Sequence, residues 1–404
     1  MKKKFNILII ISLILGIILG IYLPNVAKNI SFLGTIYVNL LKFMIIPIVF
    51  TSITVSIYNS MKLKTKTHLL LKTILIFTIM FISTFVLTSI IVAILNPASS
   101  YKYDIILWQG ELTKFNISDI ITNLFPNNFI TMIENNAVFP TIIFSVICGI
   151  ASSKINKGPS VINIIDSFKE LFNKILEYIM YLTPIGVFSL ISTTIANYGT
   201  SIISLGAKYI GVAYLCSVIA LIFVMILPVC LITKINPFTY IKKISKVWLI
   251  TMTTCSSSAT LPYTIKVCNE DLGISDKVTD MVVPLGCTIH MCGGAVSFAL
   301  LGLFCSHLFG ITIDIPTYLL MLVSATLINM AAPGIPNGGI VIGATYISLL
   351  GIPLTFIGFY SGIYKVLDMI YTTLNVTGDI SANVIINHSL DKKKSMWYTN
   401  YIKN

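Results

Sequence analysis

The chain has 404 residues, of which 56% are hydrophobic and only 10% are charged, and its mean hydropathy is +0.90. A soluble domain carries about 25% charged residues, so this composition excludes a soluble protein and indicates a polytopic membrane protein. The formal net charge of +12 does not indicate nucleic-acid binding, because the basic residues are all lysines and gather in short segments between apolar runs. Lysines have this distribution in the cytoplasmic loops of membrane proteins.

Six apolar runs in the first part of the chain are long enough to cross a bilayer, which takes about 20 residues of helix. We expect the first run to be a retained helix and not a signal peptide, because it has no small-residue cleavage site. The predicted spans are 5–24, 31–58, 68–95, 128–153, 170–197 and 203–233.

The lysines also predict the orientation of these spans. The lysine-rich segments at 62–72, 154–174 and 234–246 should face the cytoplasm, whereas the loop at 97–126 has almost no lysine and should face outward. The sequence therefore predicts a multi-pass protein of the cell inner (plasma) membrane, with both termini in the cytoplasm.

The next apolar segment, VWLITMTTCSSSATLPYTI (247–265), lies between Lys246 and Lys266 and contains a cluster of hydroxyls. A single crossing would place Lys266 outside, against the lysine bias, so we predict a re-entrant hairpin that turns at Ser256–Ser258. Non-helical backbone at membrane depth must be buried in protein or line a cavity. The serines could therefore present donors to a ligand.

A second interruption occurs at 316–352, where the glycines and prolines of AAPGIPNGG cannot sit inside one continuous helix. Two interrupted apolar segments in corresponding places indicate the midplane binding site of a transporter. Between them, the helix predicted at 278–309 contains TIHMCGG, which we expect to be unwound and to expose carbonyls to a cation. Its His290 is either a hydrogen-bonded core residue or the carrier of a proton.

The last apolar segment, 356–386, holds Asp368, Thr372, Asn375 and Asp379 at spacings that place them on one helical face. Ionisable groups at membrane depth mark a substrate or ion path. A polar stripe that serves only helix packing is the alternative.

Other kinds of chemistry have less support. Lys365 either pairs with Asp368 or extends to a membrane interface.

A hydrolase triad of Ser257, His290 and Asp379 would need a nucleophile elbow, which the sequence lacks, so we predict no enzyme. The eight cysteines contain no CxxC pair, which gives no basis for a disulfide framework or a zinc site. No cofactor is expected besides coupling ions.

Four stretches, CSSSATLP, PLGCTIHMCGG, AAPGIPNGG and LDMIYTTLNVTGD, together with KFMIIPIVFTSI at 42–53, resemble in order and separation the motifs of a known family. It comprises the glutamate/aspartate:cation symporters, also called the dicarboxylate/amino-acid:cation symporters. The resemblance implies an all-α fold with eight transmembrane helices and two re-entrant helical hairpins, a homotrimer and an elevator mechanism. The implied domains are a scaffold (1–67), span 3 of the transport domain with an outer loop (68–126), scaffold or trimerisation spans 4–5 with span 6 (127–236), the transport core (237–390) and a cytoplasmic tail (391–404).

The resemblance assigns the family's site residues, position by position, to residues of this chain. Ser257, Asn375 and the backbone around Cys255 and Ser256 would hold an α-carboxylate, and Asp368 would hold the α-ammonium. The implied substrate-binding set is Cys255, Ser256, Ser257, Met291, Gly294, Gly334, Ile335, Pro336, Gly339, Asp368, Tyr371, Thr372 and Asn375. The implied sodium ligands are Gly286, His290, Asn375 and Asp379 in one site, and Thr288, Met291, Asn329, Met330 and Ala332 in another.

Three departures from the family pattern concern the substrate. Tyr371 stands where acidic-substrate members have an arginine, Tyr364 where they have an aspartate, and Gly294 where they have a threonine. Burying a second substrate carboxylate without a cation costs several kcal/mol. We therefore predict import of a neutral L-amino acid. The alternatives are an acidic amino acid or dicarboxylate, cystine, serine or threonine, or a channel-like relative that does not concentrate its ligand.

Further departures concern the coupling ions. His290 and Cys292 replace an asparagine and a carboxylate, and Phe77, Met80 and Phe81 replace a tyrosine and two hydroxyl residues. Sodium needs oxygen ligands, so we predict that the family's third sodium site is absent. About two sodium ions, with or without a proton, would then drive uptake.

Overall fold

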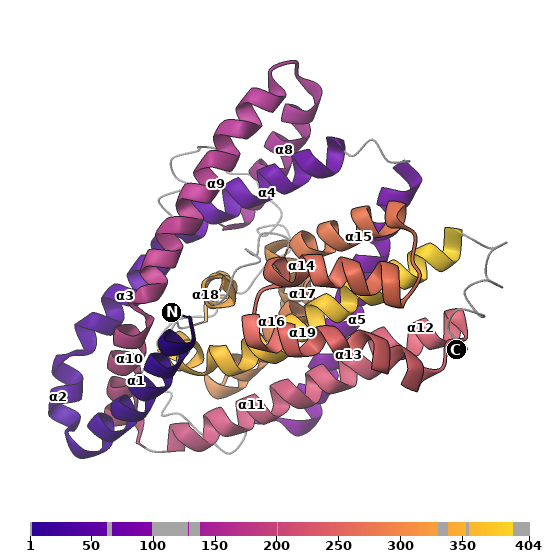
Figure 1. Ribbon diagram of the computed structural model, residues 1–404. Helices are drawn as coiled ribbons and strands as arrows, with labels where there is room; N and C mark the ends of the chain where they lie inside the picture. The colour runs from indigo at the N-terminus through magenta and orange to yellow at the C-terminus, as the bar shows by residue number, and fades with distance from the viewer. Residues whose placement is uncertain are drawn as a thin grey trace.

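The protein is described by a computed structural model that covers residues 2–62, 67–98, 128, 138–199, 201–329, 338–352 and 355–390. Within these ranges every regular element is a helix (Figure 1). The first half contains α1 (Lys2–Tyr22), α2 (Pro24–Asn29), α3 (Ser31–Phe43), α4 (Ile45–Lys62), α5 (Thr67–Leu95), α8 (Val138–Lys154), α9 (Gly158–Tyr181) and α10 (Thr183–Tyr198). The second half contains α11 (Ser201–Ala220), the π-helix η2 (Leu221–Ile226), α12 (Leu227–Thr233), α13 (Pro237–Thr254), α14 (Ser257–Lys266), the π-helix η3 (Val267–Asp271), α15 (Asp276–Ile289), α16 (Cys292–Leu308), α17 (Ile315–Asn329), α18 (Gly338–Leu349) and α19 (Thr355–Leu390).

Three continuous stretches of the described chain are long and apolar enough to cross a membrane, and two bent helix pairs would raise this number to five. The stretches are Leu69–Leu95, Ile203–Thr233 and Asp276–Leu308. They agree closely with the apolar helices predicted at 68–95, 203–233 and 278–309.

Three other predicted spans are not single straight helices. The span predicted at 5–24 ends in a bend of 119° between Ile11–Tyr22 and Pro24–Tyr37. The span predicted at 31–58 divides into α3 and α4, and the span predicted at 170–197 divides into the end of α9 and α10, which meet at 53°. A proline lies in the first turn of each following helix, where it lacks a donor and clashes with the preceding turn. These prolines are Pro24, Pro47 and Pro184. The span predicted at 128–153 corresponds to α8, and most of its residues before Val138 lie outside the described part.

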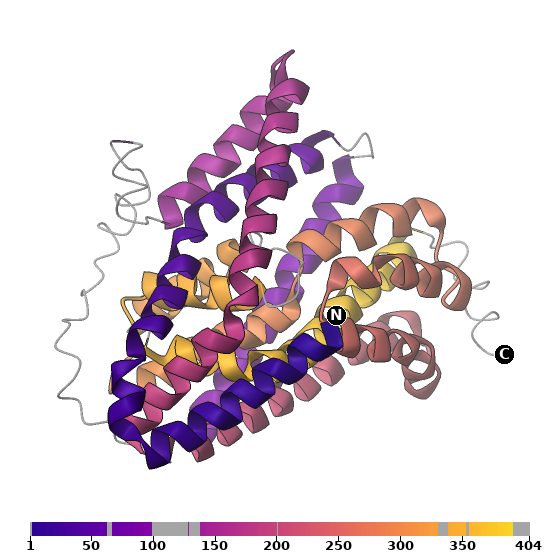
Figure 2. The same ribbon diagram turned by 60° about the vertical axis from the view of Figure 1, so that its left-hand side comes forward.

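Small residues allow the N-terminal helices to pack closely. α1 lies along α10, and a Cβ at Gly16 would come within 2.8 Å of the Phe188 carbonyl oxygen. Gly20, one turn further, lies equally close to the carbonyl of Ser192. This spacing of small residues is common where helices associate in membranes. α4 packs against α8 and α9, and these helices form the arm that extends from the rest of the molecule (Figures 1 and 2).

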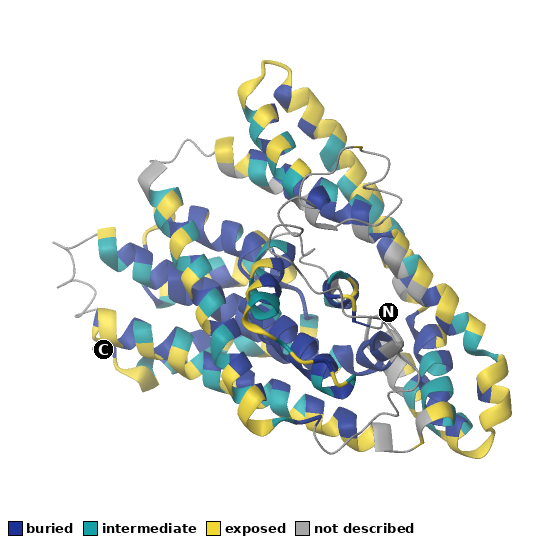
Figure 3. Ribbon diagram, turned by 180° about the vertical axis from the view of Figure 1, so that it is seen from behind, coloured by how far each residue is buried: buried dark blue, intermediate teal, exposed yellow. Residues whose placement is uncertain are grey.

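The helix α19 lies at the centre of the second half of the fold. It contacts α13, α15, α16, α11 and α18, and all residues from 370 to 384 are buried. Buried residues gather on α19 and its neighbours, whereas exposed residues are frequent on the arm and at the outer ends of helices (Figure 3). The polar residues predicted on this helix, Asp368, Thr372, Asn375 and Asp379, are therefore enclosed by protein.

Hydrogen bonds between side chains join α13 to α19. Their partners on α19 are spaced by one helical turn, so they face α13 together. Buried hydrogen bonds of this kind fix the relative position of two helices, because sliding would leave the polar groups unpaired. The pairs are Thr251 with Thr373 (2.8 Å between hydroxyl oxygens), Trp248 Nε1 with Thr377 (3.0 Å) and Tyr240 with Ser381 (3.0 Å).

Candidate functional site

The hairpin predicted around the serine cluster is present as α13, a short turn and α14. The turn is at Cys255 and Ser256, and not at Ser256–Ser258 as predicted. Cys255 adopts the left-handed conformation with φ 49°. Ser256 is the N-cap of α14, and its hydroxyl accepts from the N–H of Ala259 at 3.2 Å. Because serine is a strong N-cap residue, the helix begins at Ser257 and directs its first N–H groups toward the turn, where they can bind an anion.

The break between α15 and α16 is shorter than predicted. Only His290 and Met291 leave the helical conformation, with φ −117° and −125°, whereas we expected all of TIHMCGG to unwind. Gly293 and Gly294 lie inside α16. Close packing explains why both are glycines. A Cβ at Gly293 would collide with the backbone of Tyr371, and a Cβ at Gly294 would collide with the side chain of Asn329.

Replacing Gly293 with alanine should destabilise the protein by about 3 kcal/mol, because a Cβ there meets rigid backbone of α19. The measurement is the unfolding temperature of the purified protein in detergent. The matched control is Gly211→Ala in α11, where a Cβ would meet nothing within 4 Å. Equal stability of the two variants would contradict the packing of α16 on α19.

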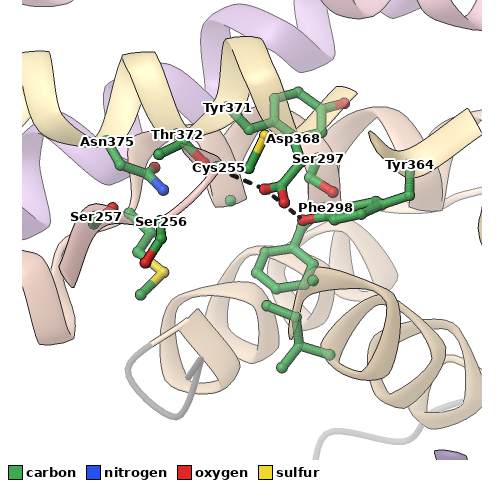
Figure 4. Close-up of a pocket in the computed structure, with 14 residues that line it drawn as sticks. Cys255, Ser256, Ser257, Ser297, Phe298, Tyr364, Asp368, Tyr371, Thr372 and Asn375 are labelled. Atoms are coloured by element: carbon green, nitrogen blue, oxygen red, sulfur yellow. Dashed lines mark hydrogen bonds between the residues drawn. The ribbon is translucent and has the colours of Figure 1, made fainter. Parts of the chain in front are cut away.

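The turn, the break and α19 surround one cavity of about 40 Å³ (Figure 4). It brings together ten of the predicted substrate residues, whereas Gly334, Ile335 and Pro336 lie outside the described residues. The predicted residues that line it are Cys255, Ser256, Ser257, Met291, Gly294, Gly339, Asp368, Tyr371, Thr372 and Asn375.

Asp368 supplies the carboxylate of this cavity and is only 7% exposed. Its Oδ1 accepts hydrogen bonds from the hydroxyls of Thr372 at 3.3 Å and Tyr364 at 3.5 Å (Figure 4). Lys365 precedes Asp368 by three positions on α19 and is only partly buried, and it does not belong to the described cavity lining. Asp368 is therefore an oriented negative group beside the cavity.

Asn375 is oriented by the break in α15–α16. Its Oδ1 accepts from the N–H of Gly293 at 2.7 Å, so the amide NH₂ group remains as the donor end of the side chain. Figure 4 shows this end directed into the cavity, opposite Ser256 and Ser257. The cavity thus has a donor-rich end formed by Asn375 and the start of α14.

Tyr371 presents its ring to the cavity but not its hydroxyl. Figure 4 shows the hydroxyl directed away from Asp368. This hydroxyl is buried and has no hydrogen-bond partner among the described residues. The side of the cavity at Tyr371 is therefore aromatic carbon.

The groups predicted to bind cations also lie together. His290 Nδ1 lies 2.9 Å from Asp379 Oδ1, and Cys292 Sγ lies 3.1 Å from His290 Nε2. The imidazole stacks on Phe77, with ring centroids 4.3 Å apart and planes within 5°. Asp379 also touches Gly286, where a Cβ would collide with its carboxylate. His290 therefore fills the space between Asp379, Cys292 and Phe77.

The second predicted cation site is described only in part, since Met330 and Ala332 lie outside the described residues. Asn329 is buried beside the break, and its amide can pair with both backbone groups of Met291 at 3.2 Å. The Thr288 hydroxyl donates to the carbonyl of Leu285 at 2.8 Å, within its own helix. Asn329 thus satisfies the backbone that the break exposes.

A family model described as the sodium:dicarboxylate symporter family matches residues 5–389. The chain belongs to this family. It is 25% identical over 394 residues to the proton/glutamate-aspartate symporter of Bacillus subtilis (strain 168), with 96% of this chain and 95% of that protein covered. The C4-dicarboxylate transport protein of the same organism is 25% identical over 407 residues, with coverage of 98% and 96%. The neutral amino acid transporter A of Homo sapiens is 28% identical over 262 residues, with coverage of 64% and 49%.

Membership confirms the resemblance noted in the sequence and makes the protein a cation-coupled symporter, not an enzyme. It also implies the glutamate-transporter fold and a multi-pass protein of a plasma-membrane transporter family. The names of these relatives cover acidic amino acids, dicarboxylates and neutral amino acids. The family therefore leaves the substrate of this symporter open.

Four further residues line the cavity of this symporter and are outside the predicted substrate-binding set: Ser297, Phe298, Ile342 and Tyr364. Ser297 and Phe298 follow Gly294 by three and four positions, and Ile342 follows Gly339 by three. Residues at this spacing share a helical face. Helical spacing from a predicted site residue was therefore the signal that could have found them.

Proposed function

We propose that this symporter imports a neutral L-amino acid together with about two sodium ions. The observation that carries the proposal is the charge of the cavity, in which Asp368 is the carboxylate and no lysine, arginine or histidine belongs to the described lining. A zwitterion matches this arrangement, with its ammonium on Asp368 and its carboxylate at the donor-rich end. A second carboxylate would have no cationic partner in the described lining, and burying it unpaired costs several kcal/mol.

The position of His290 supports coupling to two sodium ions and not to the three for which the family has sites. Its imidazole, Cys292 and Phe77 occupy the region where the family resemblance places oxygen ligands of a third sodium ion. We propose that Asp379, with the carbonyls of Gly286, His290 and Asn375, holds one sodium ion. The other site would use Thr288, Met291, Asn329, Met330 and Ala332.

We also propose that the symporter is a homotrimer in the plasma membrane, with both termini in the cytoplasm. The transport domain would comprise residues 237–390 and span 3 within 68–126. It would move against a scaffold of residues 1–67 and the trimerisation spans within 127–236. The hydrogen bonds between α13 and α19 support a transport domain that moves as one body.

The test is uptake into proteoliposomes of labelled alanine, serine, cystine, aspartate and succinate. Each substrate is offered under an inward sodium gradient and, separately, under an inward proton gradient. Sodium-driven uptake of a neutral amino acid with exclusion of aspartate and succinate is the expected result. Uptake of aspartate at a comparable rate would overturn the proposal, and proton-driven uptake without sodium would assign the coupling to protons.

Replacing Tyr371 with arginine should admit acidic substrates. A guanidinium at this position would enter the cavity from α19 and form a bidentate pair with a second carboxylate. We expect aspartate uptake to rise at least about 10-fold relative to alanine uptake, since charge-assisted hydrogen bonds contribute about 1.5–3 kcal/mol. Tyr371→Phe is the matched control, because it keeps the ring and should retain the preference for neutral amino acids. Selectivity that is the same in both variants would contradict the role of Tyr371.

A further inference from the structure

The half of the cavity away from Asn375 is lined by side chains that the substrate backbone does not require. Ser297 and Phe298 come from α16, Ile342 from α18 and Tyr364 from α19. Figure 4 shows Ser297, Phe298 and Tyr364 on the other side of Asp368 from Ser256 and Ser257. An amino acid with its carboxylate at the serines and its ammonium on Asp368 would extend its side chain toward this half, which we call the far subsite.

The hydroxyl of Tyr364 is held in place by its neighbours. Tyr364 is 5% exposed, its ring packs on Tyr360 with centroids 5.2 Å apart, and its hydroxyl donates to Asp368 Oδ1 at 3.5 Å. A Cβ at Gly339 would collide with the same hydroxyl. A phenol has one hydrogen and two acceptor positions. Because the hydrogen is directed at Asp368, the oxygen is available to the far subsite as an acceptor.

Ser297 provides the complementary group. Its hydroxyl lies 2.7 Å from that of Tyr360, and either oxygen can be the donor. When Tyr360 donates, the hydrogen of Ser297 is available to a group in the cavity that Ser297 lines. Phe298 and Ile342 make the rest of the far subsite apolar. The subsite thus offers one acceptor and one donor beside a small apolar surface.

We propose that the far subsite binds the side-chain hydroxyl of the substrate, so that the imported amino acid is a small hydroxylated one such as serine or threonine. This inference rests on the proposed import of a neutral amino acid and specifies its class. The substrate hydroxyl donates to Tyr364 and accepts from Ser297, which satisfies both of its hydrogen-bonding roles. A site built to hydrogen-bond a substrate hydroxyl rejects the analogue that lacks it, because its own polar groups are then left unpaired.

The test compares serine with alanine, which has the same backbone and no hydroxyl. In proteoliposomes under a sodium gradient, the wild-type protein should favour serine by at least about 10-fold in kcat/KM. Tyr364→Phe and Ser297→Ala should each bring the ratio close to one, mainly by raising the KM for serine. Tyr346→Phe is the matched control, since this buried tyrosine is outside the cavity lining and its hydroxyl donates to the Met321 carbonyl at 3.4 Å. It should keep the ratio of the wild-type protein.

The outcomes separate the two proposals. Transport of alanine and serine with equal kcat/KM by the wild-type protein would overturn the far subsite and leave the import of neutral amino acids standing. A serine preference that persists in both Tyr364→Phe and Ser297→Ala would overturn it as well. Uptake of neither amino acid would overturn this inference, and exclusion of cystine as well would overturn the proposed function. The two variants lie on different helices, so the test remains decisive if one of them does not fold.

Discussion

Replacing Asp368 with asparagine should reduce kcat/KM for amino-acid uptake by at least about 100-fold. Asparagine has nearly the same shape and can still accept hydrogen bonds from Thr372 and Tyr364, so the cavity should keep its form. The substrate ammonium, however, would lose its counter-charge in an enclosed site, and removing one partner of a buried ion pair costs about 3–5 kcal/mol. Uptake by purified, reconstituted protein is the measurement.

The control for this variant is Asp280→Asn. Asp280 is an exposed carboxylate on α15, so the same chemical change there should leave uptake within about twofold of the wild-type protein. Uptake by the Asp368 variant at the wild-type rate would show that the ammonium binds elsewhere. Loss of sodium binding or a lowered unfolding temperature in the Asp368 variant would instead indicate that Asp368 has a structural role.

Replacing Asp379 with asparagine should raise the sodium concentration needed for half-maximal uptake by at least about 30-fold, because a fully charged ligand contributes several kcal/mol to a buried cation. Asparagine can still accept a hydrogen bond from His290 Nδ1, which limits the effect on packing. Sodium titration of uptake at fixed amino-acid concentration is the measurement. Asp280→Asn again serves as the control.

The same titration of the wild-type protein tests the predicted loss of one sodium site. We expect a Hill coefficient that does not exceed about two, since it cannot exceed the number of sodium sites. The physical reason is that His290, Cys292 and Phe77 fill the region beside Asp379 with groups that are poor sodium ligands. A Hill coefficient near three would falsify this prediction.

The polar positions of α19 could be predicted because a helix has a fixed period. Asp368, Thr372 and Asn375 recur at spacings that place them on one face, and the structure directs all three to one cavity. The hairpin of α13 and α14 was also predictable, because lysines flank an apolar segment too short for two crossings. Its turn is one position earlier than expected, since Ser256 caps α14.

Features that depend on contacts between distant segments could not be predicted. The glycines in TIHMCGG suggested unwinding, but Gly293 and Gly294 are helical and are required by the approach of Tyr371 and Asn329. The direction of the Tyr371 hydroxyl, away from Asp368, also has no signal in the sequence. An apolar helical face looks the same in sequence whether it packs against protein or lines a cavity, so Phe298 could be found only by its helical spacing from Gly294.

Bends were missed for a local reason. A hydropathy window averages over prolines, so α3 with α4 and α9 with α10 each appeared as one span. The prolines in the first turns of α4 and α10 were in the sequence, and they end the preceding helix for steric reasons. Proline positions deserve the same weight as hydropathy when spans of this kind are assigned.

The burial of α19 on all sides limits how this protein can change its substrate. Every residue from 370 to 384 is buried, because one face lines the cavity, another hydrogen-bonds to α13, and the remainder packs on α15 and α16. A substitution on this helix therefore affects two neighbours at once. Mutations in the short helices α14 and α18 can change the substrate specificity more readily, because their cavity residues lie near helix ends. Tyr364 and Tyr371 are the positions on α19 where a change of side chain alters the chemistry of the cavity most directly.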